Sequence, residues 1–246
     1  MNFVDPTGHC KGTEYENDQS GCISWLEEKY GIDIRDWQSS DMSLLWALHE
    51  SLELYFSLLG NDLFTTVFGS KTFDYYTASD DISFGGMAHT GISFWGNLEK
   101  ISIAHTMLGI TDPYLNLVLV IAHEMAHFIV NPVDTTESPN GLNGVFEAFI
   151  NSSGWVQNGP KWIRPTVDTE YGTVSTATPY SILTDGPNPA AEDAAESLAL
   201  SLVIGPQILH TNSANILAIV HQAVYNWYWP NGIELPDPSY CNNVCY

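Results

Sequence analysis

The sequence has 246 residues, which is enough to bury a substantial core within one domain. Seven lysine and arginine residues stand against 29 aspartate and glutamate residues, so the formal net charge is -22 at pH 7. This charge argues against nucleic acid or an anionic membrane surface as a partner and favours cationic partners, unless it serves only to keep the protein soluble. The apolar run at 115–130 is short for a membrane span and contains Glu124, so we expect no membrane insertion.

The first residues carry turn chemistry, because residues 2–8 read NFVDPTG. This stretch resembles the NxVDPxG ending of the core domain in RHS and YD-repeat proteins, which are large shells with a variable effector domain at the C-terminus. The resemblance implies that residues 1–20 are the tail of such a core and a linker, that residues 21–246 are the effector domain, and that the shell is a partner. An ordinary N-terminal loop is the alternative. The first ten residues lack the basic start and apolar core of a secretory signal, so we expect release from a larger precursor or an intracellular protein.

The cysteines lie near the two ends of the chain, at Cys10, Cys22, Cys241 and Cys245. In a secreted protein this placement indicates disulfides that hold the termini, either within each end or between the two ends. A metal site built from these residues is the less favoured alternative, because neither spacing is the usual CxxC.

Hydrophobic periodicity predicts helices on both sides of one region of short strands. Helices are expected over 23–30, 41–59, 114–130, 145–150, 189–204 and 213–229. Strands are expected over 73–76, 91–95 and 101–104, with 91–94 at the edge of a cleft. The order of these elements predicts an α+β fold, in which an N-terminal lobe to about residue 131 contains a small mixed sheet and a C-terminal lobe from about residue 132 is mainly helical. We expect structural roles for the isolated histidines, His49, His89, His105 and His221.

The helix expected over 114–130 carries His123, Glu124 and His127 in the arrangement HExxH. Residues four apart on a helix share a face, so both imidazoles can converge on one metal ion. Two histidines that bind Zn²⁺ and an intervening glutamate that acts as general base are typical of metalloproteases. If the helix were only structural, Glu124 would be an unpaired charge in apolar surroundings, which is costly.

A peptidase zinc site needs a third protein ligand and one open position. Glu192 and Glu196 share one face of the helix expected over 189–204, so either carboxylate could bind the metal. The other could accept a hydrogen bond from a ligating imidazole. An exposed acidic face is the alternative in so acidic a protein. Asp193 points away from this face, and we expect it to be a solvated or capping charge.

Residues 188–197, NPAAEDAAES, resemble the glutamate helix of the gluzincin metallopeptidases, especially the ExxAE pattern of the branch that includes anthrax lethal factor. The resemblance implies a zincin-like fold, Zn²⁺ as the cofactor, Glu192 as the third zinc ligand and Glu196 as the support of a zinc-binding histidine. It also implies a tyrosine or histidine that stabilises the oxyanion. Tyr180 is the first choice for this role and Tyr171 is the second.

These features predict a monomeric zinc endopeptidase that hydrolyses peptide bonds of a protein or peptide substrate. Zinc would activate a water molecule and polarise the scissile carbonyl, while Glu124 takes the proton and passes it to the leaving nitrogen. As a toxin or effector domain, the protein would be secreted or delivered into a target cell. Two alternatives stay open, namely a secreted nutritional or glycoprotein-processing peptidase and a non-catalytic binding module with a structural zinc ion.

Overall fold

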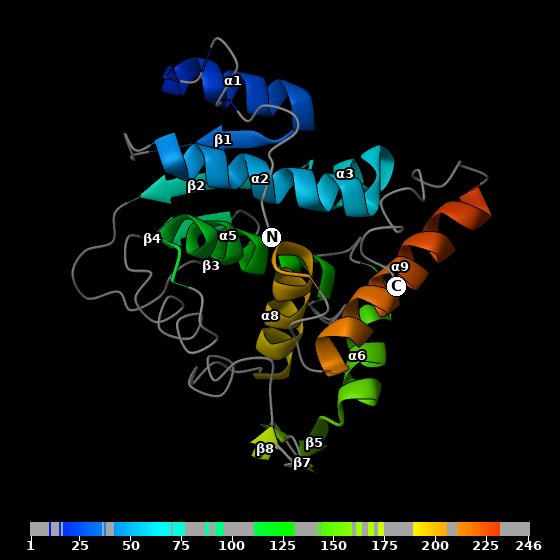
Figure 1. Ribbon diagram of the computed structural model, residues 1–246. Helices are drawn as coiled ribbons and strands as arrows, with labels where there is room; N and C mark the ends of the chain where they lie inside the picture. Colours follow the sequence, from blue (N-terminus) through cyan, green and yellow to red (C-terminus); the bar gives the residue numbers. More distant parts are fainter. Residues whose placement is uncertain are drawn as a thin grey trace.

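A computed structural model gives the fold of the chain (Figure 1). It describes residues 10, 15, 17–35, 37, 42–69, 71–76, 87–88, 92–95, 111–130, 142, 144–158, 161–163, 167–169, 172–174, 189–205 and 211–231. The described helices are α1 Gln19–Tyr30, α2 Met42–Leu59, α3 Asn61–Phe68, α5 Pro113–Val130, α6 Val145–Ser153, α8 Pro189–Val203 and α9 Thr211–Asn231. The described strands are β1 Asp33–Arg35, β2 Thr72–Tyr76, β3 Met87–Ala88, β4 Ile92–Trp95, β5 Val156–Asn158, β6 Lys161–Ile163, β7 Val167–Thr169 and β8 Gly172–Val174.

The described helices follow the predicted pattern closely, because apolar residues at helical spacing and clear end signals define them. The helix α1 ends where Gly31 adopts a left-handed conformation with φ 65° and donates its N–H to the carbonyl of Glu27. It begins earlier than predicted, however, and α3 was not predicted. The predicted strand over 101–104 lies outside the described residues.

The principal sheet is small and mixed, with the strand order β1-β2-β4-β3. Strands β1, β2 and β4 are parallel, and β3 runs antiparallel to β4. Met87 pairs with Ser93 and Ala88 pairs with Ile92, so these residues of β4 have neighbours on both sides. Ile92 and Ser93 are therefore not at an edge of the sheet, because β2 and β3 pair with them from both sides, and the expected cleft at 91–94 stays a prediction. The α+β class with a small mixed sheet is confirmed.

The core is continuous through a series of packed helices. Contacts run from α1 to α2, from α2 to α5, from α5 to α8 and from α8 to α9, while α6 packs against both α8 and α9 (Figure 1). The apolar side chains of these helices form one buried cluster. Two small antiparallel pairs, β5-β6 and β7-β8, follow α6. The helix α5 therefore contacts α2 and α3 from the N-terminal part of the chain and α6 and α8 from the C-terminal part.

Among the described residues, α5 is the helix long and apolar enough to cross a membrane by length and composition, with a mean hydropathy of 1.4 over 18 residues. Burial inside the protein covers 78% of that window. Since α2 and α8 pack against it, its apolar surface serves the protein core.

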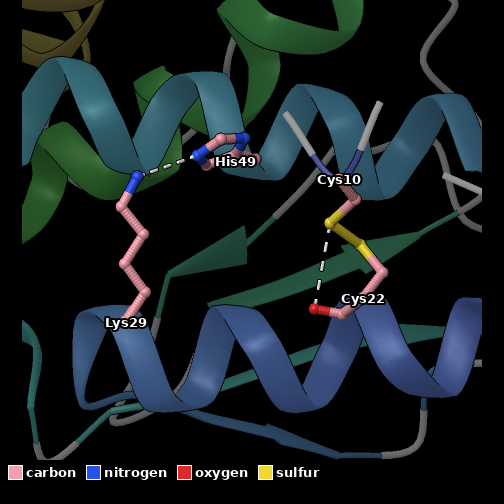
Figure 2. Close-up of a disulfide and its surroundings, with 4 residues drawn as sticks. All are labelled: Cys10, Cys22, Lys29 and His49. Atoms are coloured by element: carbon pink, nitrogen blue, oxygen red, sulfur yellow. Dashed lines mark hydrogen bonds between the residues drawn. A yellow bond between two sulfur atoms is a disulfide. The ribbon is translucent and has the colours of Figure 1, made fainter. Parts of the chain in front are cut away.

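The N-terminal end of the described chain is held by the disulfide between Cys10 and Cys22 (Figure 2). This pairing is local to one end of the chain, whereas Cys241 and Cys245 lie outside the described residues. Figure 2 also shows Lys29 of α1 reaching to α2, where its amine donates to Nε2 of His49 at 3.4 Å. The same amine lies 3.0 Å from the carboxylate of Glu53. A covalent bond therefore ties residue 10 to α1, and polar contacts tie α1 to α2.

Replacing both Cys10 and Cys22 with serine should lower the stability of the oxidised protein. Closing a loop of this size restricts the unfolded chain and contributes about 3 kcal/mol. For a chain of this length the melting temperature should fall by about 6–12 °C, measured by differential scanning calorimetry. Reductant added to the double variant is the control for any contribution from Cys241 and Cys245. An unchanged melting temperature in the double variant would contradict this role.

Candidate metal centre

The helix α5 carries the histidine pair in a well-defined position. Its first turn is capped by Asp112, whose Oδ1 accepts the N–H of Tyr114 at 2.9 Å. Asp112 is therefore the N-cap of this helix. The hydroxyl of Ser51 on α2 donates to the carbonyl of Val118 at 3.1 Å, and the buried Tyr55 hydroxyl donates to the carbonyl of Ala122 at 2.6 Å. These two bonds hold α2 against α5 directly before the HExxH residues.

His123 and His127 face the same side of α5, as their spacing predicts. Their Nε2 atoms lie 3.1 Å apart, and both side chains are buried. The ring planes stand at 88° to each other, so the two nitrogens point into a shared space from different directions. Two imidazole nitrogens this close need either a proton or a metal ion between them.

Glu192 of α8 completes a triangle of donor atoms. Its Oε2 lies 3.2 Å from Nε2 of His123 and 3.5 Å from Nε2 of His127. A tetrahedral metal ion with bonds of about 2.0–2.1 Å places its ligand atoms about 3.3 Å apart. The three observed separations agree with this value. His123, His127 and Glu192 are therefore close enough to bind one metal ion.

Glu196 lies on the other side of His123, one helical turn beyond Glu192. Its Oε2 lies 2.9 Å from Nδ1 of His123, and both side chains are only 1% exposed. In a neutral His123 with its proton on Nδ1, this N–H donates to Glu196 and leaves the Nε2 lone pair directed toward His127 and Glu192. These positions favour Glu192 over Glu196 as the ligand, which was the open choice at the level of sequence.

The carboxylates control protonation in the metal-free site. Burial disfavours an imidazolium at His123, but the hydrogen bonds to Glu192 and Glu196 outweigh burial and raise the pKa of His123 well above its usual value. Burial likewise opposes a charge on His127, and Glu192 nevertheless raises the pKa of that imidazole. Burial raises the pKa of Glu124. The pKa of Glu192 is lowered, since both histidines outweigh the effect of its own burial.

Glu124 lies between the two histidines in sequence and is 3% exposed. A carboxylate with a raised pKa is a better proton acceptor than an ordinary surface glutamate, which suits a general base. The structure thus brings a proton acceptor and three metal-compatible donors into one buried region of α5 and α8.

Other predicted residues are placed differently or fall outside the described chain. Tyr180 and Tyr171 lie outside the described residues, as do His89 and His105.

Asp193 was expected to be solvated or capping, and this is wrong. Its side chain is fully buried, because the face of α8 that carries it packs inward, and it accepts a hydrogen bond from the indole of Trp155 at 2.9 Å. Sequence periodicity contained no signal for this partner, which lies 38 residues earlier.

Comparisons with known proteins identify no family for this chain. A scan against protein-family models, a search of curated proteins and a search of solved structures each found no match to this chain.

Binding of Zn²⁺ to the metal-free protein should release protons at pH 7. The raised pKa of His123 means that this imidazole carries an extra proton below that pKa, and metal binding requires its neutral form. Apparent affinity should therefore rise with pH until the raised pKa is passed. Calorimetric titrations in two buffers of different ionisation enthalpy measure the proton count, and His221→Gln on α9 is the control. Zinc binding without proton release would contradict the proposed protonation.

Proposed function

We propose that this protein is a zinc-dependent endopeptidase with a zincin-like fold. The observation that supports the proposal most strongly is the triangle of donor atoms from His123, His127 and Glu192. Glu124, which lies between the two histidines in the sequence, is buried on the same helix. Three donors are found among the described residues, and a site with three protein ligands keeps a fourth tetrahedral position for a reactant, whereas a purely structural zinc site has four protein ligands. The mixed N, N, O donor set suits zinc.

The residues of the chain have separate tasks in this proposal. His123, His127 and Glu192 would hold Zn²⁺, and Glu196 would fix the tautomer and orientation of His123 through Nδ1. When bound, zinc supplies Lewis acidity that makes water more acidic and polarises a carbonyl. Glu124 accepts a proton from the attacking water and donates it to the leaving nitrogen. Tyr180, or Tyr171 in second place, remains the proposed hydrogen-bond donor to the oxyanion.

The Cys10–Cys22 disulfide supports action in an oxidising compartment, since such bonds persist outside the cytosol. It is compatible with a toxin or effector domain secreted after release from an RHS-type shell, and it specifically favours the alternative of a secreted nutritional or glycoprotein-processing peptidase. Delivery into a target cell would expose this bond to reduction. Comparing peptide cleavage by the oxidised and the reduced protein separates these sites of action, because an enzyme that works in a cytosol must remain active after reduction.

Replacing Glu124 with glutamine should abolish most peptide cleavage while zinc remains bound. Loss of a general base typically lowers the rate by about 10²–10⁴-fold. Cleavage of a peptide library followed by mass spectrometry, together with metal analysis of each protein, measures both properties. Glu147→Gln on the exposed face of α6 is the matched control. Unchanged cleavage in Glu124→Gln, or wild-type protein that binds zinc and cleaves nothing, would leave the non-catalytic binding module as the better description.

A further inference from the structure

The hydrogen bond between Trp155 and Asp193 connects the end of α6 to the turn of α8 that carries Glu192. Indole Nε1 of Trp155 donates to Oδ2 of Asp193 at 2.9 Å, and both side chains are buried. Trp155 is brought to this position by the left-handed Gly154, with φ 80°, which ends α6. The bond lies on a face of α8 different from that of the metal-compatible donors, because consecutive helical residues point in directions about 100° apart.

We propose that Trp155 and Asp193 are positioning residues that hold Glu192 at the metal centre. The inference rests on the proposed metal site but is independent of peptide cleavage. The other two ligands, His123 and His127, belong to one buried helix, so their relative positions are set within α5. Glu192 comes from a different helix, and its distance to both histidines depends on how the start of α8 is held.

Glu192 is less enclosed by neighbouring side chains than the two histidines, so its position depends more on how α8 is held. Its side chain is 24% exposed, whereas those of His123 and His127 are 1% and 10% exposed. Glu192 is thus the donor least enclosed by packing. Glu196 anchors α8 to His123 one turn further along, and Asp193 anchors the turn of Glu192 to α6, which packs beside α8 (Figure 1).

The hydrogen bond between Trp155 and Asp193 can hold α8 rigidly, because both partners are buried in the core. A fully buried carboxylate requires hydrogen-bond donors, since burying it without them is costly. The indole offers one N–H with a fixed direction on a large, rigid ring. Moving α8 relative to α6 would break this bond within the core, so the bond restricts the movement of Glu192 away from His123 and His127.

The test measures zinc affinity by competition with a chelator, at temperatures where each protein is folded. Trp155→Phe keeps an aromatic ring and removes the donor, and it should weaken zinc binding by about 10–100-fold, as loss of an outer hydrogen bond does at other zinc sites. Asp193→Asn keeps an acceptor oxygen for the indole and should retain affinity within about threefold. Ser201→Ala is the control, because it removes another buried hydrogen bond of α8, from Ser201 to the carbonyl of Ser197.

The absorption spectrum of the cobalt-substituted protein gives a second readout, because it reports ligand number and geometry. Trp155→Phe should alter the spectrum toward that of Glu192→Gln, whereas Ser201→Ala should lower the melting temperature without altering the spectrum. If Trp155→Phe does not fold, the double variant Trp155→Phe/Asp193→Asn avoids a buried charge that has lost its indole donor and should show the same loss of affinity.

Wild-type affinity and an unaltered cobalt spectrum in the folded Trp155 variants would overturn the inference. If Glu192 is not a zinc ligand, the result is different, because Glu192→Gln would then bind zinc as tightly as the wild-type protein. Failure of the peptidase proposal is different again. The wild-type protein would bind zinc, the Trp155 variants would lose affinity, and no peptide would be cleaved.

Discussion

The packing of α8 against α5 is the contact on which the candidate site depends. It places Glu192 and Glu196 on either side of His123, at 3.2 Å from Nε2 and 2.9 Å from Nδ1. Both carboxylates lie one helical turn apart on the face of α8 that meets α5, so each contacts a different nitrogen of the same imidazole. A rotation of α8 about its own axis would move both carboxylates away from His123 together.

Burial of so many ionisable groups requires compensation within the cluster. His123, His127, Glu124 and Glu196 are all nearly inaccessible to solvent, so charge on any of them must be balanced by a neighbour. In the metal-free protein the balance comes from protons on the imidazoles. A divalent cation can take the place of those protons, because it attracts the same lone pairs and offsets the same carboxylates. Proton binding and metal binding would therefore compete at this candidate site.

Polar contacts from separate neighbours hold the two helices, α5 and α8, that carry the candidate metal ligands. Tyr55 of α2 donates to the backbone of α5 at Ala122, and Trp155 after α6 donates to Asp193 on α8. These donors are buried, and they act on the residue before His123 and the residue after Glu192. A metal site needs this kind of support, since small displacements of one ligand lower affinity. The geometry of the centre thus depends on helices that contribute no ligand.

The sequence by itself determined most of the described helices, the strands β2 and β4 and the pairing of His123 with His127, because these follow from local periodicity, caps and the spacing along one helix. The short elements α3, β1 and β3 were not predicted, because so few residues carry too little periodicity. The sequence left open whether Glu192 or Glu196 faced both histidines, and it misjudged Asp193. Only the tertiary structure decided these points, because they depend on the rotation of α8 against α5 and on the position of Trp155, which no local pattern encodes. Pairing of Cys10 with Cys22 was likewise a matter of distance in space, since the spacing of the cysteines allowed other partners.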